Sequence, residues 1–175
     1  MTKRFATCLA AVTCLAAAPS MSRAQSVLVE GYGGYQGLRG ISVSSATNAS
    51  HEGTGLLGGD ILLEVGGLGL GVAVDKTVSG NFEPWAGSLL AGFIVPVTIV
   101  RLELLGELGR RAPDFGDIFS SPGQTFVGIH PGVRFRFVPT PINIGAAAII
   151  RWNTSGGDFG SPDYGLVARV GFEFP

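Results

Sequence analysis

The sequence contains few charged residues and no excess of basic over acidic residues. Only 14% of its 175 residues are charged, against about 25% in an average soluble domain. Its 12 basic and 13 acidic residues leave a formal net charge of -1, so no basic surplus is present to bind nucleic-acid phosphates. Hydrophobic residues make up 46% of the chain, which argues against intrinsic disorder. The length allows one domain, and no nucleic-acid partner is expected.

Long apolar runs are also missing, and the one moderately apolar run lies at the start. Lys3 and Arg4 are followed by the uncharged, mostly apolar run 5–18 and by the ending Ser22-Arg23-Ala24. A basic start, a short apolar stretch and small residues at the -3 and -1 positions are typical of a Sec signal peptide. The run is too short to cross about 30 Å of hydrocarbon as a helix. We therefore expect residues 1–24 to be a signal peptide that is cut after Ala24.

Cysteine is missing from the rest of the chain. Both cysteines, Cys8 and Cys14, lie inside the expected signal peptide. The mature domain, residues 25–175, therefore has no disulfide to stabilise it, and another feature must close its fold.

Instead, the mature domain contains eight segments of strand length, each long enough to cross a bilayer as a tilted strand of about 9–11 residues. Tight connections at 66–67, 96–97 and 139–141 alternate with longer polar ones at 39–53, 79–84, 110–123 and 154–163. Short turns on one rim and long loops on the other are typical of bacterial outer-membrane barrels. The expected strands are 26–38, 54–66, 68–78, 85–95, 98–109, 124–138, 142–153 and 164–174.

Within these segments, charged and aliphatic side chains alternate. Successive side chains of a strand point to opposite faces, and the charges of a given strand fall on one face. A basic residue that faces lipid at the midplane costs about 2–4 kcal/mol, so the charged face is expected to fill the interior and the aliphatic face to meet lipid. Lys76, next to Asp75, departs from the pattern and could reach the membrane surface by snorkelling. The expected interior charges are Glu30, Asp60, Glu64, Asp75, Arg101, Glu103, Glu107, Arg134, Arg136, Arg151, Arg169 and Glu173.

Aromatic residues on the lipid-facing parity gather at the two ends of the strands. Trp and Tyr fall at the loop end and Phe at the turn end, as in the two aromatic girdles of membrane barrels. The expected girdle residues are Tyr35, Trp85, Trp152 and Tyr164 on one side and Phe135, Phe137, Phe172 and Phe174 on the other. A soluble barrel would have an apolar inside, and a β-sandwich would not bury rows of Arg and Glu.

With a signal peptide, eight amphipathic strands and the closing strand Tyr164–Phe174, the mature chain resembles the small outer-membrane barrels of OmpA and OmpX type. The resemblance implies an all-β fold, an eight-stranded antiparallel up-and-down transmembrane β-barrel. It implies a monomer in the cell outer membrane, in contact with lipid and lipopolysaccharide. It also implies that the barrel-assembly machinery recognises the last strand, where Phe172 and Phe174 match the usual signal, although Pro175 follows and Arg169 replaces the preferred Gly.

The main candidate for chemistry is His130. Some barrels that this chain resembles are lipid A deacylases or palmitoyl transferases, which use a His with a nearby Ser at the membrane face. His130 is followed by Pro131 and not by a His-x-Ser pattern, and its parity places it inside with Arg134. A bulge at Pro131 would instead turn it outwards. His130 is thus either a catalytic residue or an interior polar residue.

No cofactor or metal site is expected. Four acidic residues of the long connections could bind Ca²⁺ or cations that bridge lipopolysaccharide, but their ordinary interpretation is solvated loop acids. These residues are Asp114, Asp117, Asp158 and Asp163.

Three classes of function remain open. We expect a structural or surface-interaction protein that acts through the loops at 39–53, 110–123 and 154–163. The alternatives are a lipid-modifying enzyme and a narrow, porin-like channel. Eight strands leave an interior that side chains just fill, which argues against an open pore.

Overall fold

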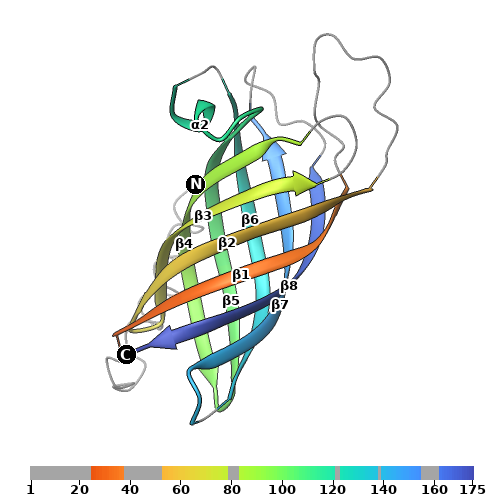
Figure 1. Ribbon diagram of the computed structural model, residues 1–175. Helices are drawn as coiled ribbons and strands as arrows, with labels where there is room; N and C mark the ends of the chain where they lie inside the picture. The colour runs from red at the N-terminus through yellow and green to blue at the C-terminus, as the bar shows by residue number, and fades with distance from the viewer. Residues whose placement is uncertain (1–24, 38–52, 79–82, 121–122, 138, 155–161) are drawn as a thin grey trace, which may run out of the picture.

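Eight strands close into a single antiparallel barrel in chain order (Figure 1). The computed structural model describes residues 25–37, 53–78, 83–120, 123–137, 139–154 and 162–175, so the expected signal peptide lies outside the described residues. The strands are β1 (Gln25–Gly37), β2 (Gly53–Val65), β3 (Leu68–Val78), β4 (Trp85–Val97), β5 (Val100–Ala112), β6 (Gln124–Arg136), β7 (Ile142–Asn153) and β8 (Asp163–Phe174), with one short helix, α2 (Asp117–Ser120).

The last strand pairs with the first and closes the ladder. The β1–β8 register runs from Val27 opposite Phe174 to Gly37 opposite Tyr164. Every backbone edge of the barrel is therefore paired with a neighbouring strand, which is the condition for a sheet in lipid. The expected eight-stranded, all-β, up-and-down barrel is confirmed.

Among the residues that the structure describes, no helix is both long and apolar enough to cross a membrane.

Two strands have the expected bounds, β3 and β7, and the others differ by at most three residues at either end. The expected turn at 96–97 is wrong, because Pro96 and Val97 belong to β4 and the turn is Thr98–Ile99. Proline is often a turn residue, but here Val97 pairs with Val100 and leaves two residues for the connection.

Two expected loop boundaries are also wrong. β5 continues to Ala112, so Arg110 and Arg111 belong to the barrel and not to the loop at 110–123. β8 begins at Asp163, which is a buried strand residue and not a solvated loop acid. In both cases polar composition suggested a loop, whereas the charges lie at the ends of the strands.

Two of the turns use the left-handed region of the backbone. Gly66 and Gly67 have φ of 59° and 86°, the pair of positive angles that a two-residue type I′ hairpin needs. Thr98 adopts φ of 59° in the next turn on the same rim, although it is β-branched. This rim therefore has very short connections, whereas the helix α2 lies at the opposite end of the barrel (Figure 1).

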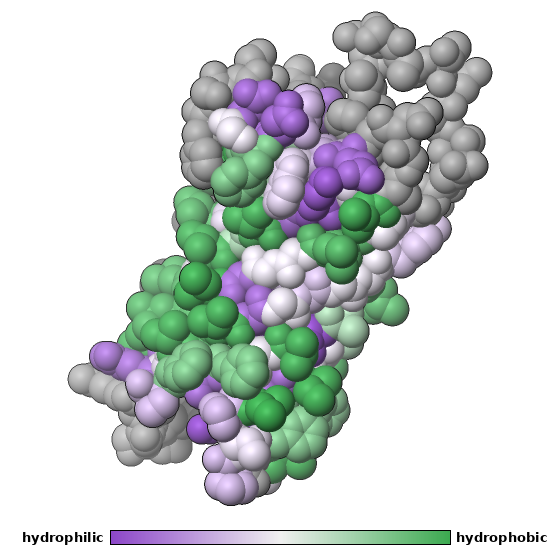
Figure 2. Space-filling model, in the orientation of Figure 1, coloured by the Kyte–Doolittle hydropathy of each residue, from purple (hydrophilic) through white to green (hydrophobic). Residues whose placement is uncertain are grey.

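The outer wall of the barrel is apolar. Leu70, Leu89 and Leu166 are 59%, 62% and 65% exposed, values that are unusual for leucine in a soluble domain. Figure 2 shows hydrophobic side chains spread over the wall of the barrel. Because exposed apolar patches of this extent mark a membrane or protein contact, the wall has the character of a lipid-facing surface.

Candidate functional site: the charged interior

The interior of the barrel receives every second side chain of each strand. The even-numbered residues of β1, β2, β4 and β6 and the odd-numbered residues of the other four strands point inwards. The structure places all twelve ionisable residues of the expected interior set on this side, and eleven of them are at most 9% exposed. The twelfth, Arg136, lies at the turn end of β6 with a side chain that is 45% exposed.

A central cluster joins two arginines to three carboxylates. Arg134 donates from Nε and Nη2 to the two carboxylate oxygens of Glu30, at 3.0 and 2.7 Å. The same Nη2 lies 2.8 Å from Glu103 Oε2. Arg169 donates to Glu103 and Asp60, and its Nη2 lies 3.1 Å from Glu30 Oε2. The cluster, Glu30, Asp60, Glu103, Arg134 and Arg169, thus holds one more carboxylate than guanidinium.

A second cluster surrounds Arg151 nearer the loop end. Arg151 Nη1 donates to Asp75 Oδ1 at 3.0 Å, and Nε and Nη2 each donate to Glu107 at 2.8 Å. Tyr32 donates its hydroxyl to Asp75 Oδ2 at 3.3 Å. His130 Nε2 lies 2.8 Å from Glu107 Oε2. The guanidinium of Arg151, which is 0% exposed, is therefore held on both edges by a carboxylate.

A third cluster lies at the turn end. Arg101 donates from Nη1 to Glu64 at 2.7 Å and from Nη2 to Glu173 at 2.9 Å. Arg136 Nη1 lies 3.6 Å from Glu173 Oε1, and Asn143 Nδ2 is 3.5 Å from the other oxygen of that carboxylate. Two arginines therefore match two carboxylates here.

Sequence reasoning missed four members of the interior. Tyr32 and Phe126 were assigned no role, and Arg111 and Asp163 were placed in loops. Arg111 donates to Asp163 at 3.1 Å, and both are buried. The Phe126 ring, 0% exposed, lies 4.8 Å from the Arg151 guanidinium and 5.6 Å from that of Arg111. The odd parity shared by Arg111 and Glu107 on one strand was the signal that could have found Arg111.

His130 lies inside the barrel and is 4% exposed. Its pairing opposite Leu105 keeps the register of β5 and β6. On the other side, the β6–β7 register passes from Ile129 opposite Ile150 to Gly132 opposite Ala147, so the ladder is interrupted at Pro131 without a slip. Proline has no N–H for the ladder, but no bulge turns His130 towards lipid. The imidazole contacts Glu107 and is not at the membrane face.

The expected girdle residues lie on the outer wall. Tyr35 and Tyr164, 59% and 51% exposed, are at the loop end together with the half-buried Trp85 and Trp152. Phe135, Phe137, Phe172 and Phe174 are 43% to 51% exposed at the turn end. Lys76 also points outwards at the loop end, where Nζ lies 2.6 Å from Glu83 and 5.6 Å from the Trp85 ring centroid.

In the part of the chain that the structure describes, no group of three or more His, Cys, Asp or Glu side chains is arranged to hold a metal ion. Asp158 lies outside the described residues.

No protein-family model and no curated protein matches the chain. Several solved structures, however, are similar to it. The N-terminal β-barrel domain of Pseudomonas aeruginosa OprF is 16% identical over 85% of this chain and 97% of that one, with a TM-score of 0.61. Neisserial surface protein A is 13% identical over 85% and 97%, with a TM-score of 0.59. Outer membrane protein H of P. aeruginosa is 16% identical over 86% and 100%, with a TM-score of 0.50. The chain has the fold of these small bacterial outer-membrane barrels.

Proposed function

We propose that this protein is a monomeric outer-membrane β-barrel with a structural or surface-interaction role, closed to ions along its axis and active through its extracellular loops. The observation that carries the proposal is the inverted polarity of the barrel. Arg134 and Arg151 are 0% exposed in the interior, whereas the wall exposes rows of Leu, Val, Ile and Phe. A barrel of this kind is stable in lipid and unstable in water.

Membrane placement is also supported by the likeness to outer-membrane barrels and by the aromatic residues at both ends of the wall. Export would use residues 1–24. We expect the mass of the mature protein to correspond to a chain that begins at Gln25. A mature chain that retains Cys14, with or without an attached lipid, would contradict this expectation.

Closure of the interior is supported by the three ion-pair clusters. The central and loop-side clusters place fully buried guanidinium groups across the barrel from β6 and β7 to carboxylates of β1, β3 and β5. A water-filled path would expose these groups to solvent. Two clusters of buried, mostly apolar side chains, around Leu62 and around Leu56, fill the interior together with the ion pairs. The interior is therefore plugged by side chains, consistent with the narrow bore of eight strands.

A lipid-modifying activity receives less support. Such chemistry needs a nucleophile or base that reaches a lipid ester from the membrane face. His130 is inside the barrel, with its Nε2 on Glu107, and so does not reach the outer wall.

The decisive experiment compares the full barrel with a variant in which residues 38–52, between β1 and β2, and residues 154–162, between β7 and β8, are replaced by short turns. We expect both proteins to migrate differently unheated and boiled in SDS gels, because a closed ladder has no free edge and resists detergent. Neither should give stepwise conductance in planar bilayers or hydrolyse phospholipid vesicles. Cells that display the full barrel should attach to members of a panel of immobilised proteins and glycans, and cells with the short-loop variant should not. Stepwise conductance, vesicle hydrolysis or unchanged attachment would each contradict the proposal.

Assembly would depend on the closing strand, where Phe172 and Phe174 are the proposed signal for the barrel-assembly machinery. Phe93 provides a matched control, since Phe93 and Phe174 are outward aromatics that are 50% and 51% exposed. We expect Phe174→Ala to lower the amount of folded protein in the outer membrane, and Phe93→Ala to leave it unchanged, as measured by heat-shifted bands. Equal amounts of the two variants would refute a special role for Phe174.

A further inference from the structure

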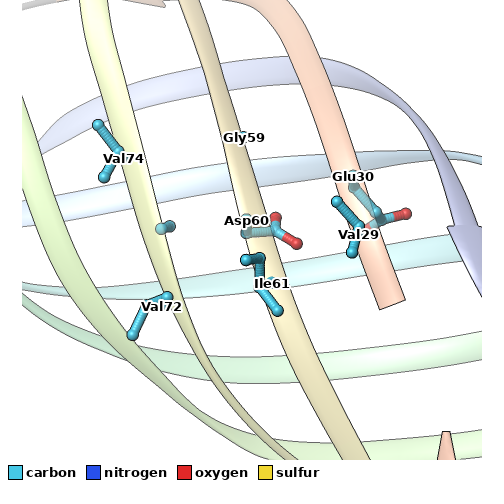
Figure 3. Close-up of a pocket in the computed structure, with 8 residues that line it drawn as sticks. Val29, Glu30, Gly59, Asp60, Ile61, Val72 and Val74 are labelled. Carbon is cyan, nitrogen blue, oxygen red and sulfur yellow. The ribbon is translucent and has the colours of Figure 1, made fainter. Parts of the chain in front are cut away.

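Two carboxylates of the central cluster lie directly opposite each other in the barrel ladder. The register pairs Glu30 of β1 with Asp60 of β2, and both side chains point inwards and are 4% exposed (Figure 3). Directly opposite residues of an antiparallel pair have Cβ atoms about 4.5–5.5 Å apart, and like charges in this arrangement repel each other. Among the described strand pairs, no other two carboxylates are opposed in this way.

The arginines of the central cluster do not fully neutralise this pair. One nitrogen, Arg169 Nη2, contacts both carboxylates, since it donates to Asp60 Oδ2 and lies 3.1 Å from Glu30 Oε2. Arg134 donates to both oxygens of Glu30, and both guanidinium groups also contact Glu103. Three carboxylates therefore share two positive charges.

The charged groups next to the central cluster have partners of their own. Towards the turns, Arg101 donates to two carboxylates of its own cluster. Towards the loops, Arg151 donates to Asp75 and Glu107, and His130 also contacts Glu107. In the part of the barrel that the structure describes, the excess negative charge is thus not balanced by an adjacent cation. On β3, β4 and β7, the residues that pair with members of the cluster are uncharged: Ala73, Ile94 and Gly145.

One oxygen atom of the cluster has no use in these contacts. Asp60 Oδ1 is buried and has no hydrogen-bond partner among the described residues, whereas Oδ2 accepts from Arg169. Glu30, by contrast, uses both of its oxygens. A buried charge without a partner is costly, and a buried carboxyl group takes up a proton instead. Two carboxylates that share one site hold a proton between them for the same reason.

We propose that Glu30 and Asp60 form a proton-binding site, in which the folded barrel holds one proton at neutral pH on Asp60 Oδ1, directed towards Glu30. The proton makes Asp60 neutral, so two carboxylates, Glu30 and Glu103, remain against the two guanidinium groups. The central cluster is then balanced in charge, like the cluster at the turn end. The proton comes from solvent during folding, because the separated carboxylates of the unfolded chain are ionised at neutral pH.

Infrared spectroscopy detects this proton directly, because the C=O stretch of a protonated carboxyl group is separate from the bands of carboxylates. The barrel is measured in dodecylphosphocholine micelles, since this detergent has no ester carbonyl. We expect a protonated-carboxyl band at neutral pH in the parent protein and its loss in Asp60→Asn. Asp75→Asn is the matched control and should keep the band. Asp75 is 2% exposed, but it lies opposite Gly58 and Ala86, and both of its oxygens accept from Arg151.

Urea titration of the same variants in phospholipid vesicles measures the energetic consequence. The amide of Asp60→Asn offers an acceptor to Arg169 and a donor towards Glu30 without the uptake of a proton. We therefore expect Asp60→Asn to unfold at a higher urea concentration than the parent protein at neutral pH. Asp75→Asn should unfold at a lower one, because it removes a carboxylate that is paired with Arg151.

The advantage of Asp60→Asn should grow with pH. Above about pH 5, the folded parent binds one proton more than its unfolded chain, so its stability falls as pH rises, whereas Asp60→Asn binds no such proton. The ratio of the two unfolding constants, parent to variant, should therefore rise about tenfold per pH unit between about pH 6 and pH 8. Other groups that titrate in this range, such as His130, are present in both proteins and cancel in the ratio.

Absence of the protonated-carboxyl band from the parent protein would overturn the proposal, as would its persistence in Asp60→Asn or its loss in Asp75→Asn. An Asp60→Asn barrel that fails to fold, or that unfolds at lower urea than the parent, would also overturn it, since Asp60 would then act as an ionised partner of Arg169. A ratio of unfolding constants that does not change with pH would exclude the uptake of a proton on folding.

Discussion

The interior and the outer wall of this barrel are built from the same eight strands but are stabilised in different ways. Arg134 and Phe135 are adjacent in β6. Arg134 points inwards, is 0% exposed and contacts Glu30 and Glu103, whereas Phe135 points outwards and is 43% exposed. Inside, each charge depends on particular partners at fixed distances. Outside, the stability of each apolar side chain depends only on its contact with lipid in place of water.

This contrast means that the two surfaces tolerate different substitutions. Removing one partner of a buried pair leaves the other charge unsatisfied in a low-dielectric space. Exchanging one apolar residue for another on the wall keeps its solvation in lipid, whereas introducing a charge there does not. The largest effects are therefore expected where a specific contact is lost inside, and the next largest where a charge is placed outside.

The largest expected effect is that of Arg134→Ala. It removes one of the two guanidinium groups of the central cluster and leaves Glu30, Asp60 and Glu103 with Arg169 alone. The free energy of unfolding should fall by about 3–5 kcal/mol, the usual cost of breaking a buried ion pair. Urea titration of the barrel in phospholipid vesicles, followed by the heat-shifted band, measures it.

Arg136→Ala is the control, because Arg136 also points inwards but is 45% exposed and contacts Glu173 at 3.6 Å. Its loss should cost less than about 1 kcal/mol, as for an exposed ion pair. If the two variants were destabilised equally, the burial of a charge within the interior would not determine its contribution to stability.

A charge on the wall should have the next largest effect. Leu104 is 53% exposed in the middle of β5 and pairs with Phe93 of β4. Leu104→Arg should lower the free energy of unfolding in vesicles by about 2–4 kcal/mol, because the guanidinium would face the hydrocarbon. Leu104→Phe keeps an apolar side chain and should change it by less than about 1 kcal/mol. A Leu104→Arg barrel as stable as the parent in vesicles would place this wall outside the membrane.

The division into two surfaces could be predicted from the sequence because a strand has a period of two. In β5 the residues Arg101, Glu103 and Glu107 alternate with Leu102 and Leu104, which fixes both the strand and its inward face. The bounds of β3 and β7 were also predicted correctly, because Gly, Pro and polar residues border both segments. Strand ends were less predictable, because Arg111 and Asp163 lie among the polar and glycine residues that also make loops.

The partners of each charge could not be predicted in the same way. Arg169 meets Asp60 across 109 residues of sequence, and Arg134 meets Glu30 across 104. Which carboxylate faces which arginine depends on the stagger of the strands around the barrel, and one strand read alone carries no information about stagger. The alignment of Gly31, Gly59 and Gly87 across β1 to β4 was hidden for the same reason, since these glycines come together only through three successive strand pairings.

The smallest expected effect lies at the turns, which belong to neither surface. Thr98 adopts φ of 59°, a left-handed conformation that costs an ordinary L-residue about 1–2 kcal/mol, whereas the neighbouring turn meets the same demand with Gly66 and Gly67. Thr98→Gly should therefore raise the free energy of unfolding by about 1 kcal/mol or less, because glycine relieves the strain but also gains freedom in the unfolded chain. Gly66→Ala should lower it by a similar amount, since Gly66 also has φ of 59° and a Cβ there meets no atom within 4 Å, so only the backbone is affected. Both values come from the same urea titration in vesicles. A loss of stability in Thr98→Gly would show that the threonine side chain, and not the backbone angle, determines the stability of this turn.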